Sequence, residues 1–273
     1  MGEYVPFQLK LDGDTAAYHQ FQGYDGYMAL AGFAWTLALV THYAETGKIR
    51  QRGDFLGRHA VRGKAPAEGS VLVDLMVWIE RSPEAVFGLA GAGVASSSFL
   101  YGLVERVISR NLGNNAAPQN PLISDLIKKR GGDVEHLVAI TEAPIRQTHS
   151  VIDNGAEWID IVGGHNIISR FNGETRDYVK LNVEDTAVQQ ESFSVSAFNA
   201  NSGYGSVFDS ALGRNVPFSM SRETLRRLGH VFSWGLDQYA NRTGGLVFVT
   251  HSRILAMDGT PKRYIVSDAR KVE

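Results

Sequence analysis

Apolar and polar residues alternate in short runs near the start of the chain, and this pattern predicts β-strands. Phe7–Leu11 alternates and ends at the turn-forming Asp12-Gly13-Asp14. Phe55–Val61 reads as a second strand. Gly69–Glu80 carries apolar side chains on both faces, which is typical of a strand covered on both sides. Together with an intervening helix, these runs predict an N-terminal β-α-β-β layer with helices packed on it.

Two longer runs carry no charge. Gly26–Ala44 has nineteen residues and predicts a helix over Tyr27–Tyr43, which Gly47 would end. Ala85–Val104 has twenty residues and predicts a helix that continues to Ile108. We expect these two apolar helices to form a close-packed pair.

Small residues form a stripe along each of these predicted helices. In the second helix they recur every three or four positions, and they are Gly88, Gly91, Ala95, Ser98 and Gly102. The first helix has a matching stripe in Ala31, Ala34 and Ala38. Small side chains let helix backbones approach closely. The stripes therefore predict that the two helices pack on each other or on copies of themselves, as in a homo-oligomer.

The same two runs are long enough to span a bilayer, so a membrane-active, pore-like effector is an alternative. Their Gly- and Ser-rich composition is only weakly apolar, and neither run has an aromatic belt or a basic flank. The chain also has no cysteine, and its first residues lack the pattern of a secretory signal. We therefore expect buried helices in a cytoplasmic protein, with membrane association as the alternative.

The C-terminal half changes to short alternating runs. These predict strands over residues 158–162, 178–183, 192–198, 206–208, 246–256 and 262–268. Ser221 resembles an N-cap for a helix that reaches Tyr239, and Asp258-Gly259 suits a hairpin turn. Strands on either side of one helix predict a small twisted sheet or a partly closed barrel. The class is α+β, with domains at 1–112 and 151–273 joined by a linker and helix at 113–150.

Charge is distributed unevenly along the chain. The net charge is −2 overall, whereas Gly205–Glu273 has ten Lys/Arg against six Asp/Glu, a net of +4. A possible surface for an anionic partner comprises Arg222, Arg226, Arg227, Arg253, Lys262 and Arg263. A small barrel with basic and aromatic residues can bind single-stranded nucleic acid. The competing interpretation is a solvated helix face beside aromatic residues of the barrel core.

Cofactor motifs are incomplete. Gly91–Ser96 resembles a dinucleotide loop, but no acidic residue follows at the distance that the ribose requires. Gly57–Ala65 resembles a phosphate-binding loop with one residue too many, and Ala65 stands where a hydroxyl should bind magnesium. The eight histidines are dispersed. We therefore expect no cofactor and no metal.

Catalytic signals are equally sparse. No nucleophile elbow of the form G-x-S-x-G occurs. Asp160, Glu174, Asp177 and Lys180 could together form a nuclease-like cluster, although scattered carboxylates with a following lysine are common. A nuclease-like enzyme stays an alternative, and we expect no catalytic residue.

The order of elements resembles that of uncharacterised bacterial and prophage-borne proteins. The resemblance rests on the opening strand with its Asp/Gly turn, the strand beginning Gly69-Ser70-Val71, the apolar helices and the C-terminal β-module. Some such proteins lie beside anti-phage systems, so the resemblance implies a possible part in defence. We expect a bacterial protein that binds a protein partner and self-associates, without its own catalysis.

Overall fold

The protein is α+β and consists of two compact units. The computed structural model describes residues 2–51, 53–64, 71–89, 96–180, 183–255 and 260–272. The first unit comprises Met1–Leu126 and Leu137–Lys180, and the second comprises Ile127–His136 and Leu181–Glu273. The long helix α5 (Pro121–Thr148) contributes residues to both units.

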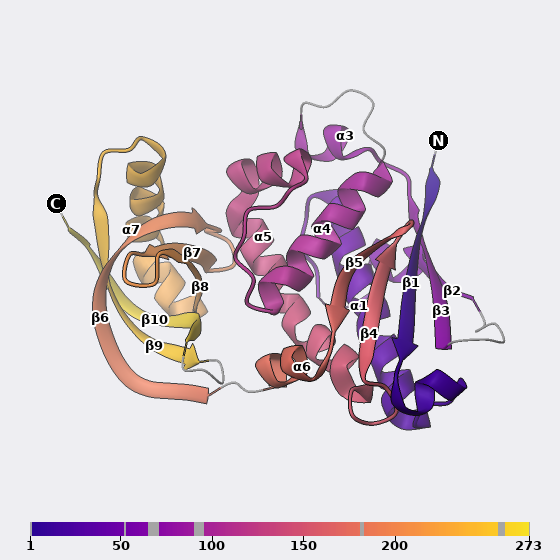
Figure 1. Ribbon diagram of the computed structural model, residues 1–273. Coiled ribbons are helices and arrows are strands. Elements are labelled where there is room, and N and C mark those ends of the chain that lie inside the picture. Colours follow the sequence, from indigo (N-terminus) through magenta and orange to yellow (C-terminus); the bar gives the residue numbers. More distant parts are fainter. Residues whose placement is uncertain are drawn as a thin grey trace. The chain divides into compact units, whose positions relative to one another are not determined.

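The first unit is built on an antiparallel sheet with strand order β2-β3-β1-β4-β5 (Figure 1). The strands are β1 (Glu3–Asp12), β2 (Val61–Gly63), β3 (Val71–Ile79), β4 (Trp158–Gly163) and β5 (Asn166–Phe171). In the central strand, Phe7 lies opposite Leu75 on one side and Gly163 on the other. The alternation of β1 therefore places one row of apolar residues on a single face of the sheet.

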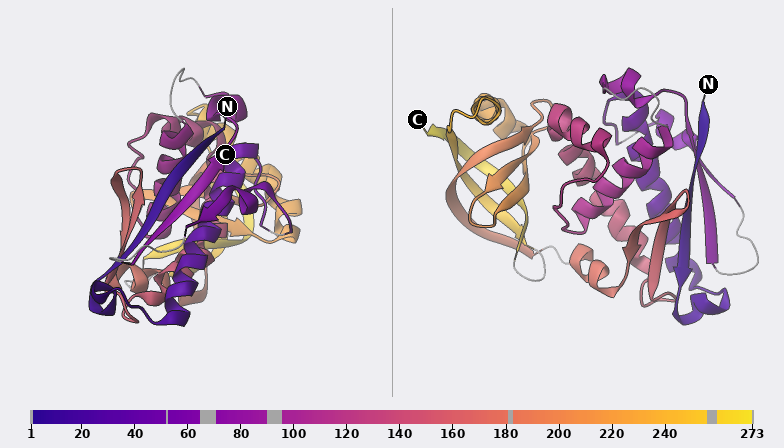
Figure 2. Two further views of the ribbon diagram at one scale, coloured as in Figure 1. Left: turned by 90° about the vertical axis from the view of Figure 1, so that its right-hand side faces the viewer. Right: turned by 45° about the horizontal axis from the view of Figure 1, so that its top comes forward.

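Helices cover that face. They are α1 (Gly23–Thr46), α2 (Leu56–Ala60), α3 (Pro83–Phe87), α4 (Ser96–Asn111), α5 and α6 (Gly173–Lys180), with short 3-10 turns η1 (Asp14–Tyr18) and η2 (His149–Val151). Figure 2 shows α1 lying along the sheet beside β1 and β3. As predicted, α1 ends at Gly47, whose φ of 63° is in the left-handed region that glycine adopts without strain.

The opposite face of β3 is only partly covered. Val71, Val73 and Leu75 are buried, whereas Met76 and Trp78 on the other face are half-buried. The Trp78 ring lies 4.7 Å from the ring of Tyr4 on the neighbouring strand. The prediction of a layer on both sides was wrong, because aromatic neighbours within the sheet shield these side chains instead of a second layer.

The second apolar run does not form one helix. Helix α3 ends at Phe87, and Gly88 follows with a φ of 61°, outside any helix. A residue in the left-handed conformation cannot continue a right-handed helix. Glycine adopts that conformation readily because it has no Cβ. The predicted continuous helix over 85–108 was therefore wrong. Gly91 and Ala95, and with them most of the loop-like motif, lie outside the described residues.

The remaining small residues contact other elements of their own unit. A Cβ on Gly102 of α4 would lie 2.7 Å from Asn120 Nδ2 and 2.9 Å from Ile123 Cγ1, at the start of α5. Asn120 also donates to the Ser98 carbonyl oxygen at 2.9 Å. The small side chains of α4 thus admit α5, which the sequence pattern did not indicate.

Alanines of α1 face the sheet edge. Ala38 is buried, Ala34 half-buried and Ala31 exposed, and all three line a groove beside Val61 of β2. Among the described helices, none combines the length and apolar character that crossing a bilayer requires.

The second unit is a closed five-stranded barrel with the strand order β10-β8-β7-β6-β9. Its elements are β6 (Val183–Phe198), β7 (Tyr204–Asp209), β8 (Arg214–Met220), α7 (Arg222–Ala240), β9 (Leu246–Leu255) and β10 (Pro261–Val272). Only β8 and β10 pair in parallel. The long strand β6 curves around the barrel (Figure 1). This result confirms the predicted C-terminal β-module in its barrel form.

Local signals place the barrel helix correctly. The Ser221 hydroxyl accepts a hydrogen bond from the Thr224 backbone N–H at 3.1 Å, as the N-cap prediction requires. Helix α7 then packs Leu228 and Phe232 into the barrel core. The Asp258-Gly259 turn lies outside the described residues.

The division between the units differs from the predicted domains. Residues 158–171 form β4 and β5, and β4 pairs with β1, with Ile161 opposite Leu9. Residues 178–180, predicted as the start of a strand, end helix α6. The barrel unit therefore begins at Leu181 after the break, and the predicted linker and helix at 113–150 comprise the connection from α4 to α5 and α5 itself.

Candidate functional site

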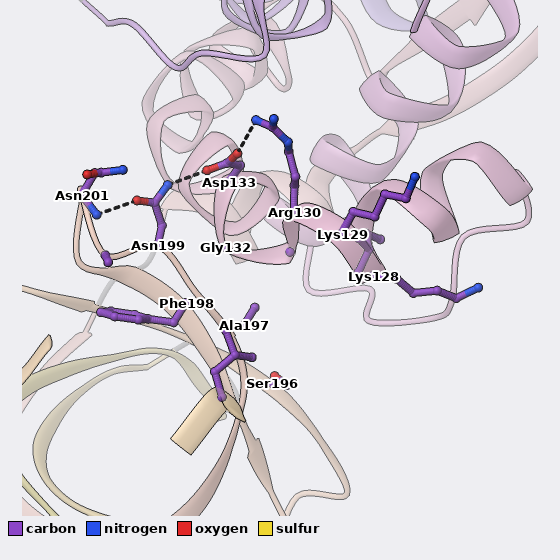
Figure 3. A pocket seen from close by; sticks show the side chains of 14 residues that line it. Lys128, Lys129, Arg130, Gly132, Asp133, Ser196, Ala197, Phe198, Asn199 and Asn201 are labelled. Atoms are coloured by element: carbon purple, nitrogen blue, oxygen red, sulfur yellow. Dashed lines mark hydrogen bonds and ion pairs between the residues drawn. The ribbon is translucent and has the colours of Figure 1, made fainter. Parts of the chain in front are cut away.

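A polar cavity of about 330 Å³ lies in the second unit, between α5 and the end of β6. Its walls come from two segments of chain, residues 127–133 of α5 and residues 196–201 at the turn between β6 and β7. Figure 3 shows these two segments facing each other across the cavity. The site thus joins a helix to the rim of the barrel.

A break in α5 shapes the helical wall. Arg130 has φ −141° and ψ 40°, which are not helical values, and Gly131-Gly132 follows at once. A Cβ on Gly132 would lie 2.5 Å from the Phe198 carbonyl carbon and 2.6 Å from the Asn199 nitrogen. Only glycine lets the helix backbone approach the barrel turn this closely. The double glycine is therefore the point of contact between α5 and the barrel turn.

A chain of polar contacts ties the two walls together. Asn199 Nδ2 donates to Asp133 Oδ1 at 2.5 Å, and the other oxygen of Asp133 lies 3.5 Å from Arg130 Nη1. Asn199 Oδ1 in turn accepts from the backbone N–H groups of Asn201 and Ser202. One asparagine therefore fixes the conformation of the turn and its attachment to α5.

A ring stack adds a second point of attachment. The His136 ring lies 4.5 Å from the Tyr204 ring, with planes 7° apart. Burial lowers the pKa of His136, and the nearby Asp133 carboxylate opposes this shift. Burial therefore favours the neutral form of the imidazole.

Positive charge dominates the cavity mouth. Lys128, Lys129 and Arg130 are consecutive and exposed, whereas Asp133 is the one carboxylate among the lining residues. In Figure 3 the side chains of Lys128 and Lys129 extend away from Asn199. The site can therefore offer cations to an anionic group that approaches the barrel.

The cavity continues onto the outer face of the barrel. Ser196 lines it, and its hydroxyl lies 2.8 Å from the hydroxyl of Ser206 on β7. The next outward position of β6, Ser194, pairs with Phe208, whose side chain is 40% exposed. Because alternate residues share a face, these side chains form one outward row that we call the barrel face.

The connectivity of the barrel is that of a known ligand-binding architecture. Three antiparallel strands are followed by a helix and a hairpin, and the third strand pairs in parallel with the fifth. The oligonucleotide- and oligosaccharide-binding fold is likewise a five-stranded Greek-key barrel, and it holds ligands on its second and third strands and at its strand 1–2 loop.

The basic residues predicted from the sequence lie on three elements of the second unit, α7, β9 and β10. Arg222, Arg226 and Arg227 lie on α7, and Arg227 donates to the Ser267 carbonyl oxygen. Lys262 and Arg263 lie at the start of β10, about 16 Å and about 13 Å from Ser267 at 3.3 Å per residue. Arg253 is already paired, because two of its nitrogens contact the Asp185 carboxylate at 2.6 and 3.1 Å.

The nuclease-like cluster is not assembled. Asp160 is buried and forms two hydrogen bonds with Arg170, at 2.6 and 3.0 Å. Asp177 contacts Arg176 instead of Lys180. Within the described residues, no group of three metal-binding side chains occurs. These carboxylates therefore act as structural ion-pair partners.

The barrel interior holds a second polar group. The Tyr264 hydroxyl donates to Asp209 Oδ2 at 2.5 Å, and burial together with this carboxylate raises the pKa of the phenol. The His251 ring lies 4.3 Å from Tyr264, and neither ring nitrogen has a hydrogen-bond partner among the described residues. All three side chains are buried.

Replacing His251 should stabilise the barrel. A buried imidazole without partners costs about 1–3 kcal/mol of desolvation. The His251→Leu variant should recover about 1 kcal/mol or more, measured as slower hydrogen exchange of β9 and β10. Faster exchange in this variant would show that the imidazole stabilises the barrel.

Sequence reasoning missed Lys128–Arg130 and Asn199. Their signal was present, since three cations precede a double glycine, but the partner turn lies about seventy residues away.

The chain matches no protein-family model, no curated protein and no solved structure.

Proposed function

We propose that the second unit binds single-stranded nucleic acid on the barrel face. The observation that carries this proposal is that three consecutive exposed cations, Lys128–Arg130, line the same cavity as the turn between the first two barrel strands. Phosphates supply most of the affinity for nucleic acid through such cations. The fold places its ligands at the same turn.

An extended strand fits the barrel face better than a small anion does. From the cations, the outward row passes the half-buried Ser196 and Ser194 of β6 to the exposed ring of Phe208, which lies opposite Ser194. Hydroxyls can bind sugar or phosphate oxygens, and an exposed aromatic ring offers a surface on which a base can stack. A ligand with repeating charges and flat bases matches this sequence of groups.

The test is binding of a fluorescein-labelled twenty-nucleotide oligo(dT) to the full chain, followed by fluorescence anisotropy. Lys128→Glu with Lys129→Glu should weaken binding at least tenfold and flatten its salt dependence, since each lost phosphate contact removes about 0.7 from the log–log slope. Phe208→Ala should weaken binding about fivefold or more, because one stacked base contributes about 1–3 kcal/mol.

The matched control reverses the same charge on α7. Arg222→Glu with Arg226→Glu changes two exposed cations on the surface that the sequence suggested. We expect it to leave the affinity within about twofold of wild type. The absence of binding at micromolar protein in low salt would contradict the proposal. A larger loss of affinity in the α7 variant would show that the nucleic acid binds at α7.

Self-association, a protein partner and a role in anti-phage defence stay predictions from the sequence. The position of Gly102 against α5 favours a packing role for that residue within one chain.

A further inference from the structure

A groove of about 410 Å³ lies in the first unit, between α1 and the edge of the sheet. Its walls are mainly apolar, with Ala31 and Ala34 from α1, Val61 and Gly63 from β2, and Leu75 from β3. Strand β2 ends the sheet, with the order β2-β3-β1. The groove therefore runs beside a strand whose outer edge borders no other strand of that sheet.

The register shows which backbone groups face outward. The Lys64 N–H donates to the Asp74 carbonyl oxygen at 2.9 Å, so residues 64 and 74 form a hydrogen-bonded pair. In an antiparallel ladder such pairs alternate, which makes Val61 and Gly63 the positions whose N–H and C=O point away from β3. Both side-chain positions also line the groove. An incoming strand could pair with these groups and place alternate side chains in the groove.

The segment of sequence that leads into β2 and forms it is rich in basic residues. Between Lys48 and Lys64 the sequence has six Lys or Arg and one Asp. Arg58 lines the groove and lies 5.7 Å from the Trp35 ring, while Arg62 lies on the other face of the sheet, over Tyr4. A guest strand would meet apolar residues on one face and a cation on the other.

We propose that this edge binds an extended peptide in which aliphatic residues alternate with acidic ones. Pairing with Val61 and Gly63 adds a strand to the sheet, aliphatic side chains enter the groove, and Asp or Glu faces Arg62. Nucleic acid fits this edge less well, because the aromatic rings on which bases could stack already contact other side chains. Trp35 contacts Phe55 and Arg58, and Tyr4 contacts Trp78 and Arg62.

The test uses a synthetic array of ten-residue peptides probed with the full chain. Bound peptides should show aliphatic residues alternating with Asp or Glu. The Gly63→Pro variant removes an outward N–H but no hydrogen bond to β3, and prolines are tolerated at sheet edges. It should weaken binding at least tenfold while the melting temperature stays within about 3 °C of wild type.

Two further variants keep the result decisive. Ala34→Leu fills the groove without altering the edge and should also weaken binding tenfold, which covers the case in which Gly63→Pro does not fold. The Arg62→Glu variant should no longer bind the acidic peptides. It should instead bind versions of the same peptides in which Lys replaces Asp and Glu. The absence of bound peptides, a preference without alternation, or unchanged binding by Gly63→Pro and Ala34→Leu would each overturn the proposal. Loss of oligo(dT) affinity in Gly63→Pro would assign the edge to nucleic acid instead.

Discussion

Between pH 7 and pH 4 the first unit should lose about 3 kcal/mol of unfolding free energy through His149. This side chain is fully buried at the end of α5, stacked 4.1 Å from Phe171. Burial lowers its pKa to about 4, and the charges of Lys180 and Arg176 act in the same direction. Its Nδ1 lies 2.8 Å from the Ile145 carbonyl oxygen, so the neutral ring donates there.

The sign follows from the two pKa values. The unfolded chain binds a proton near pH 6.5, whereas the folded chain binds one only near pH 4. The stabilising effect of neutral His149 is therefore complete above pH 6.5 and is lost progressively as the pH falls to about 4. At about 1.4 kcal/mol per pKa unit, the interval gives about 3 kcal/mol.

Urea unfolding followed by tryptophan fluorescence measures this change. A Trp234→Phe background leaves Trp35, Trp78 and Trp158, all in the first unit. His149→Gln cannot be protonated, so it should be less stable than the background at pH 7 and should lose about 3 kcal/mol less on acidification. The pKa of His42 is also lowered by burial, but His42 is present in both proteins, so its contribution cancels in the difference between their acid dependences. Equal acid dependence in the two proteins would refute the assignment.

Gly132→Ala should detach the kinked part of α5 from the barrel. The added Cβ would lie 2.5–2.7 Å from three backbone atoms of Phe198 and Asn199, which cannot rotate away as a side chain does. Overpacking of this kind costs about 1–3 kcal/mol. This cost exceeds or cancels the gain of about 1 kcal/mol that alanine brings to a helix.

Hydrogen exchange measured by mass spectrometry reads this effect locally. The turn at 199–203 should exchange about tenfold faster in Gly132→Ala, and oligo(dT) binding should weaken with it. Gly229→Ala is the matched control, because its Cβ on α7 meets only Leu225 Cδ1, at an ordinary 3.5 Å. It should slow exchange in α7. Unchanged protection of the turn in Gly132→Ala would mean that the helix and the turn are not coupled.

Local patterns predicted most elements of both units. Alternation located β1 and β3, Gly47 ended α1, and Ser221 began α7, because each signal depends on residues a few positions apart. The same reasoning failed at Gly88, where a left-handed φ ended a helix that composition alone would continue. It located the strand at 158–162 correctly but assigned it to the C-terminal module, because its partner β1 lies about 150 residues earlier.

The sequence by itself determined the α+β class, the C-terminal β-module and the ends of helices α1 and α7. Periodicity, capping and turn chemistry are local, so they can be read without a partner. Only the tertiary structure decided that Lys128–Arg130 belong to the barrel, that Ala31 and Ala34 face a sheet edge, and that Asp160 pairs with Arg170. These contacts join residues from distant parts of the chain. The local sequence pattern is compatible with several tertiary arrangements, and strand pairing and close backbone approach select one of them.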